Sequence, residues 1–230
     1  DIDVDGDGTL DSVTLGKNDI GLPDAERKYD SIEVSLEKQW NAKWYMRASY
    51  VWSHNYGNTE GLVKSDFAGG AQTDTGTTQD FDFPELMVGA NGNLPNDRRH
   101  TFKLYGAFAP TDEWTIGANL LVQSGRPKNC FGVLPAAEYE QGGVAPYLGG
   151  SSFLACNGAV VPRGSLGTMP ILWNLDMGVT YEPHWAKGLS LAVNVINVFN
   201  KHTPIKRYEN AESARPNGSG ILGPDGYTLS

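Results

Sequence analysis

The feature that most constrains this chain is a strict alternation of apolar and polar residues in several separate runs. The clearest run covers residues 28–40, where Ile32, Val34 and Leu36 fall on one face while Glu33 and Ser35 fall on the other. Successive side chains of a β-strand point to opposite faces, so this period of two predicts strands. We expect strands at residues 28–40, 43–54, 98–109, 114–125, 172–182 and 189–200, paired as three hairpins.

Alternation alone fits two kinds of protein, because a soluble antiparallel sheet with one wet face has the same pattern as a membrane barrel. Aromatic placement favours the barrel, since Trp and Tyr rings prefer a membrane interface. One girdle is predicted at the ends of the strands joined by short turns, formed by Trp40, Trp44, Phe108, Trp114, Tyr181 and Trp185. A second is predicted near the opposite ends, formed by Tyr50, Trp52, Phe102, Trp173 and Phe199.

The lengths of the connections also favour a membrane barrel. Short turns alternate with long, polar, Gly-rich stretches, and a compact soluble domain rarely carries such long loops. Outer-membrane barrels have short periplasmic turns and long external loops. We therefore expect an all-β, antiparallel transmembrane β-barrel segment of about six strands, part of a larger barrel because the smallest single-chain barrels use about eight. The predicted extracellular loops are residues 1–27, 55–97, 128–171 and 201–230.

The alternation assigns side chains to two environments. The lipid-facing set is predicted to include Ile32, Val34, Leu36, Leu104, Leu120, Leu175 and Leu191. The lumen-facing set is predicted to include Ser35, Arg47, Lys103, Asn119 and Asp176.

Charge and motif content argue against several function classes. The net charge of −9 does not suit nucleic acid, which requires basic patches to neutralise phosphate. No apolar run approaches the roughly twenty residues of a transmembrane helix. No GxSxG elbow and no Gly-rich turn leading into a helix is present, so the sequence does not predict an enzyme.

The two cysteines, Cys130 and Cys156, lie in the same long connection. No CxxC or His-rich spacing indicates a metal site. An even pair of cysteines in an oxidising compartment predicts a disulfide, whereas two reduced, buried thiols would be expected in the cytoplasm. The surrounding Gly, Pro, Asn and Ser residues favour the disulfide.

An acidic run opens the chain. Alternate carboxylates can converge on a hard cation, and the intervening glycines permit a tight turn, so this run is a candidate calcium loop. The match to an EF-hand is incomplete, since Ser12 occupies the twelfth position in place of Glu. A calcium site and a solvated acidic turn both remain open. The candidate ligands are Asp1, Asp3, Asp5, Asp7 and Asp11.

The segment Asn96–His100 stands directly before the third predicted strand. Its dense charge would suit an anion or ligand. We favour a structural network at the outer rim, in which Asp97 pairs with Arg98 or Arg99.

Three motifs in order along the chain resemble the C-terminal part of TonB-dependent outer-membrane receptors, particularly the Oar-like branch. They are residues 94–100 (LPNDRRH), 121–127 (LVQSGRP) and 194–200 (NVINVFN). The resemblance implies that residues 1–230 belong to the C-terminal portion of a large barrel in the outer membrane of a Gram-negative bacterium. Proteins of this family use a plug domain and energy from TonB to import scarce ligands. No plug, TonB box or final aromatic-ended strand is recognised here.

The partners implied are therefore outer-membrane lipid, the TonB system acting through regions outside this chain, and an imported ligand that the sequence does not identify. An alternative from another class is a secreted, calcium-braced β-sandwich or adhesin module. A sandwich must cover the apolar face with a second sheet, whereas a barrel leaves that face outside.

Overall fold

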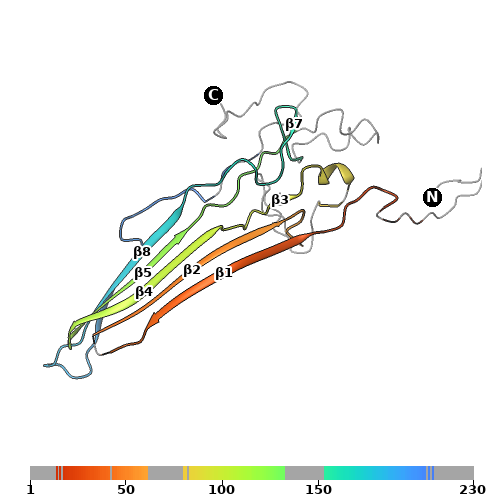
Figure 1. Cartoon of the computed structure of the whole chain (residues 1–230). Coiled ribbons are helices and arrows are strands. Elements are labelled where there is room, and N and C mark those ends of the chain that lie inside the picture. Colours follow the sequence, from red (N-terminus) through yellow and green to blue (C-terminus); the bar gives the residue numbers. More distant parts are fainter. Residues whose placement is uncertain are drawn as a thin grey trace, which may run out of the picture.

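The computed structural model describes residues 14, 16, 18–41, 43–61, 80–81, 83–132, 153–205, 207 and 209. Long antiparallel strands dominate it (Figure 1). They are β1 (Arg27–Lys38), β2 (Trp44–Gly57), β4 (His100–Thr111), β5 (Trp114–Gln123), β8 (Leu172–Tyr181) and β9 (Leu191–Val195). The connections contain β3 (Gly92–Asn93), β6 (Ala155–Cys156), β7 (Ala159–Val160) and the 3-10 helix η1 (Pro84–Met87). This confirms the expected all-β, antiparallel fold.

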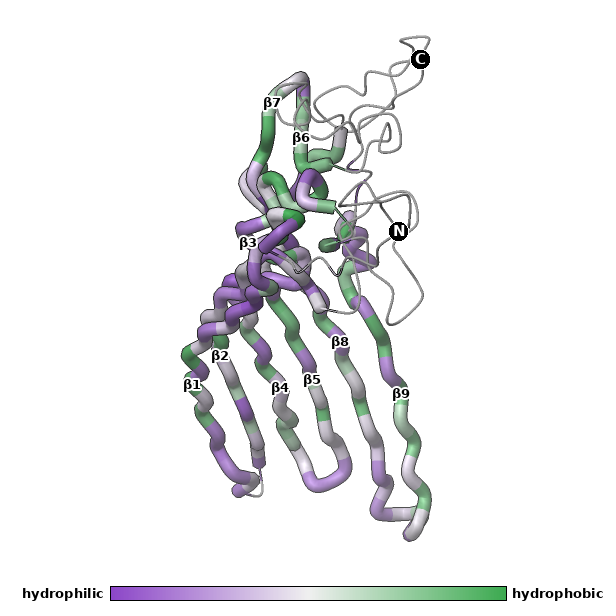
Figure 2. The backbone as a smooth tube through the Cα atoms, turned by 90° about the vertical axis from the view of Figure 1, so that its right-hand side faces the viewer, coloured by the Kyte–Doolittle hydropathy of each residue, from purple (hydrophilic) through white to green (hydrophobic). Residues whose placement is uncertain are grey.

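The long strands form a single sheet in which each pairs with the next along the chain, in the order β1-β2-β4-β5-β8-β9. Strand β3 pairs with β2, and β6 and β7 form a separate hairpin. Short turns join the strands at one end of the sheet, and the described parts of the long connections lie at the other end (Figure 2). Among the described strands, β1 and β9 lie at the two edges. No helix in the described part of the chain is long and apolar enough to cross a membrane.

Two strand ends differ from the sequence prediction by three residues or more, and each difference has a local cause. The last strand was expected to reach residue 200 but ends at Val195. Asn197 and Asn200 adopt φ angles of 52° and 47°, a left-handed conformation that Asn tolerates but that ends a strand. Strand β2 was expected to end at 54 but continues to Gly57, where a Cβ would lie 2.1 Å from the Glu26 carbonyl oxygen. Glycine therefore permits the close approach of β1 at this point.

The buried hydrophobic core of the described residues lies beside the end of the sheet, in a structure that we call the cap. The cap comprises the described residues of 80–99, 124–132 and 153–171 together with Glu209. The sequence led us to expect solvated loops in these regions, yet their few apolar residues pack together. The core consists of Leu86, Met87, Ala90, Leu94, Cys130, Phe131, Phe153, Leu154, Ala155 and Met169.

Candidate functional site

The register of the sheet places apolar and polar side chains in separate cross-strand rows. Paired residues of neighbouring strands share a face. One row contains Leu36, Ala48, Leu104, Leu120 and Leu175. The next row, on the opposite face, contains Glu37, Arg47, Tyr105, Asn119 and Asp176. All seven residues of the predicted lipid-facing set therefore fall on one face, and the five of the predicted lumen-facing set fall on the other.

The apolar face is exposed although it is rich in large side chains. Ile32, Val34 and Leu36 on β1 are 64%, 62% and 62% exposed, and Val193 on β9 is 66% exposed. Large apolar patches of this kind mark a surface that meets a membrane or a partner. The described residues contain no second sheet packed over this face, since the other sheet is the two-stranded β6-β7 hairpin.

Aromatic side chains gather at both ends of this face. At the short-turn end, the Trp114 and Tyr181 rings stack with centroids 4.4 Å apart, and Trp44 pairs with Phe108 across β2 and β4. Toward the cap, the rings of Trp173 and Phe199 meet edge to face with their centroids 5.6 Å apart. The Tyr50 hydroxyl oxygen is 2.7 Å from Nδ1 of His100. These aromatic rings therefore lie on either side of an aliphatic band, in the order that the girdle prediction requires.

The polar face carries a hollow of about 490 Å³ whose floor is made of small residues. Ala107, Gly117 and Gly178 fall in one cross-strand row, so three neighbouring strands lack bulk at the same level. Tyr105 and Asp176 lie in the adjacent row. Oδ1 of Asp176 accepts hydrogen bonds from Asn174 Nδ2 and Asn197 N at 2.7 and 2.8 Å, which orients that carboxylate.

The cap end of the sheet joins two of the motifs noted in the sequence. The backbone N–H of His100 donates to Oγ of Ser124 at 3.1 Å, and the Ser124 N–H donates to the His100 carbonyl at 2.8 Å. The next residue, Gly125, tolerates no Cβ, because that atom would lie 1.9 Å from the Met169 carbonyl oxygen. These contacts explain why a Ser-Gly pair follows β5.

Asp97 is the centre of the predicted rim network. Its carboxylate is 4% exposed, accepts the Asn55 backbone N–H at 2.9 Å and pairs with Arg99 at 2.9 Å. Of the two partners predicted for Asp97, Arg98 and Arg99, it is therefore Arg99 that forms the ion pair. The neighbouring Arg98 is half-buried, and burial together with the charge of Arg126 lowers the pKa of its guanidinium, while Asp97 opposes that shift.

Two buried ion pairs in the cap were not predicted from the sequence. Arg126 lies 2.7 Å from Glu209, and the Glu209 carboxylate also accepts the Asn129 backbone N–H at 3.2 Å. Arg163, which is 2% exposed, lies 3.9 Å from Asp80 and donates from Nε to the Ala90 carbonyl at 2.8 Å. The members of each pair are far apart in sequence, so no local pattern could reveal them.

The structure describes the predicted disulfide but not the predicted calcium ligands. Cys130 and Cys156 are joined in a disulfide with Cα atoms 5.8 Å apart, and this bond links the cap core to the β6-β7 hairpin. No group of three or more His, Cys, Asp or Glu side chains suited to a metal occurs among the described residues. The proposed calcium ligands, Asp1, Asp3, Asp5, Asp7 and Asp11, lie outside those residues.

Comparison with known proteins finds similarity to the TonB-dependent transporter Oar of Myxococcus xanthus, at 32% identity over 185 residues. The match covers 78% of this chain but only 16% of the length of that relative. No protein-family model matches the chain. No solved structure matches it.

Proposed function

We propose that this chain forms part of the barrel wall and external loops of a TonB-dependent outer-membrane transporter. The observation that carries the proposal is the position of the hydrophobic core. A soluble sheet would pack its apolar face inward, whereas here that face is exposed and the core lies in the cap. In a bilayer, lipid hydrocarbon covers such a face.

The similarity to the Myxococcus xanthus transporter supports membership of the same family. On this proposal the whole protein imports a scarce ligand across a Gram-negative outer membrane with energy delivered through TonB, and it is not an enzyme. This chain supplies the wall, and its contribution to ligand contact comes from the loops and the upper part of the polar face.

The orientation follows from the asymmetry of the connections. Short turns of outer-membrane barrels face the periplasm and long loops face the exterior. The cap therefore lies on the outside of the cell, where its disulfide is suited to an oxidising environment. The three short turns lie on the periplasmic side.

Spin labels on adjacent residues test the face assignment. Leu104 and Lys103 belong to opposite faces of β4. In the full-length protein reconstituted in vesicles, a label at position 104 should be relaxed by oxygen dissolved in the lipid, and a label at 103 by a water-soluble nickel complex. The reverse accessibilities, or recovery of the native protein in the soluble fraction, would reject the proposal.

Uptake measurements test the transport part separately. The ligand is first identified by comparing the growth of wild-type cells and cells that lack the gene on limiting nutrients. Deletion of the gene and deletion of TonB should each abolish the accumulation of that ligand. Transport that persists without TonB would contradict the energy source but leave the barrel assignment standing.

The secreted β-sandwich receives less support. It requires a second sheet on the apolar face, and none is found among the described residues. Full extraction of the native protein by salt or carbonate, without detergent, would favour the sandwich.

A further inference from the structure

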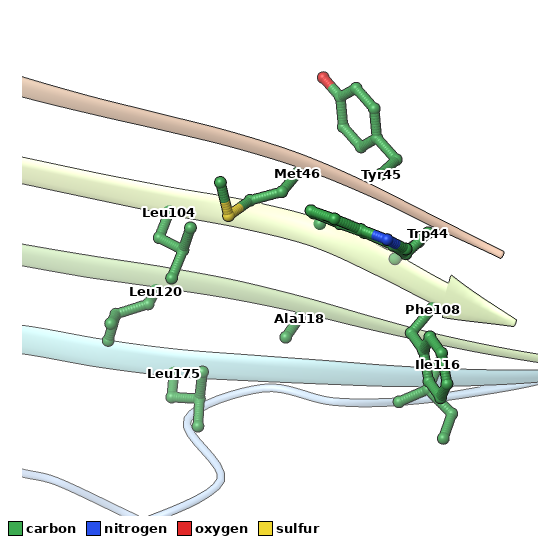
Figure 3. Close-up of a pocket in the computed structure, with 11 residues that line it drawn as sticks. Trp44, Tyr45, Met46, Leu104, Phe108, Ile116, Ala118, Leu120 and Leu175 are labelled. Carbon is green, nitrogen blue, oxygen red and sulfur yellow. The ribbon is translucent and has the colours of Figure 1, made fainter. Parts of the chain in front are cut away.

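The apolar face contains a hollow of about 460 Å³ near its short-turn end. Its lining residues belong to β2, β4, β5 and β8. Figure 3 shows Trp44 and Phe108 at one end of the hollow and Leu104 and Leu175 toward the other. Gly106 and Ala118, which pair across β4 and β5, leave the space between these larger groups. The hollow is thus a consequence of small residues within an otherwise bulky apolar band.

Lys38 lies at the edge of this hollow. It belongs to the same cross-strand row as Met46, Gly106 and Ala118, and it is the last residue of β1. Its ammonium group lies 4.8 Å from the centroid of the Trp44 ring, which lines the hollow. An ammonium has three N–H donors, and the hydrogen bond of Lys38 to the Gln39 carbonyl oxygen at 2.7 Å uses one.

We propose that this hollow is a binding site for one phospholipid of the periplasmic leaflet, with an acyl chain in the hollow and an anionic headgroup phosphate at Lys38. This inference rests on the proposed membrane placement. The charge of Lys38 complements phosphate, and its ammonium lies beside the ring of Trp44 at the short-turn end, which is the level of headgroups in the proposed orientation. The site recognises a lipid by shape and charge together.

The dimensions of the hollow suit a lipid chain. It follows β4 from Phe108 to Leu104, about 14 Å along the strand. One leaflet of a bilayer contributes about 15 Å of hydrocarbon, so the hollow extends through no more than one leaflet. An apolar hollow left empty would lose dispersion contacts around its lining, and a flexible chain restores them.

The experiment uses the intact protein extracted from outer membranes, delipidated in a neutral detergent and titrated with phosphatidylglycerol while bound lipids are counted by native mass spectrometry. Phosphatidylcholine, which carries no net charge, serves as the comparison lipid. The wild type should retain one phosphatidylglycerol more tightly than phosphatidylcholine. Equal affinities for the two lipids would overturn the assignment of an anionic headgroup.

Two pairs of variants locate the site. Ala118→Leu fills the hollow and should abolish the tight lipid, whereas Ala48→Leu adds the same bulk to the same face outside the lining and should retain it. Lys38→Gln should weaken phosphatidylglycerol binding about fivefold, the contribution of one lysine near an anionic lipid surface, and leave phosphatidylcholine binding unchanged. Lys187→Gln, in another short turn, should have no effect.

Heat-modifiable mobility on gels shows which variants are folded. If Ala118→Leu does not fold, Lys38→Gln decides the question, because its side chain is at the end of a strand. Tight binding that survives both Ala118→Leu and Lys38→Gln would overturn the proposal. Displacement of the lipid by millimolar inorganic phosphate would overturn the role of the acyl chain. A protein that partitions into membranes but retains no lipid would refute this site alone and leave the proposed function intact.

Discussion

An arginine at Leu120 or at Leu121 should have very different effects, because these adjacent residues of β5 belong to opposite faces. Leu120 pairs with Leu104 and Leu175 on the apolar face, whereas Leu121 pairs with Lys103 and Asn174 on the polar face. The two substitutions are chemically identical and are made one residue apart. They therefore separate the effect of the environment from the effect of strand propensity.

The cost at Leu120 depends on its depth in the membrane. It lies six residues from Trp114, the girdle residue at the start of β5. At about 3.4 Å per residue and a strand tilt of about 40°, this gives a height of about 16 Å above that girdle. The apolar band is about 25 Å tall, so Leu120 is within about 4 Å of the midplane. Arginine costs about 2–4 kcal/mol at the midplane and little near the interfaces, so we expect Leu120→Arg to cost about 2–3 kcal/mol.

The assay is reversible unfolding of the full-length protein from phosphatidylcholine vesicles in guanidinium chloride, with the free energy of unfolding taken from matched titrations. Leu121→Arg should cost about 1 kcal/mol or less, the scale of a like-charge cross-strand neighbour, here Lys103. Equal costs at the two positions, or a larger cost at Leu121, would refute the division of the sheet into lipid and lumen faces.

Three further outcomes concern the cap and the acidic run. Reduction of the cap disulfide should remove about 3–4 kcal/mol of stability, because the released loop gains entropy in the unfolded chain. Hydrogen exchange at the Phe131 amide should then become faster. Unchanged exchange would mean that packing alone stabilises the cap. Arg126→Met should cost about 3–5 kcal/mol because it removes the positive charge beside the buried Glu209 carboxylate, and adding Glu209→Gln should recover part of that loss. Additive losses in a thermal melt would show that the pair is not coupled. Calorimetric titration of the intact protein should show calcium binding with a dissociation constant of about 10⁻⁴ to 10⁻³ M, and the Asp5→Asn/Asp7→Asn variant should show no heat of binding. The same heat from both proteins would mean that the acidic run is a solvated turn without a calcium site.

The sheet could be predicted from the sequence because its signal is local. Each strand repeats the same period of two, and the aromatic residues mark its ends, so β1, β4 and β5 begin and end close to the expected residues. The face of every side chain then follows from the register. The ends of β2 and β9 were less accurate, since they depend on Gly57 and Asn197 adopting positive φ angles, which alternation does not report.

The packed cap could not be predicted, because its stability depends on contacts between distant segments. Phe131 and Leu154 enter one cluster with Met87, yet no periodic spacing connects them in the sequence. Glu209 pairs with Arg126 although the sequence assigned residues 201–230 to an extracellular loop. The cysteines were informative here, because a disulfide requires that its two flanking segments be neighbours.

The open edges of the sheet set a condition on the proposed insertion into a membrane. Within the described strands, β1 and β9 each pair on one side only, so their other sides present backbone N–H and C=O groups without a neighbouring strand. Lipid hydrocarbon offers no hydrogen-bond partner, so each backbone N–H or C=O group without a hydrogen bond costs several kcal/mol there. Neighbouring strands must therefore dock against both edges before or during insertion. On the proposed function, these six strands can insert only when further strands of the barrel pair with both edges.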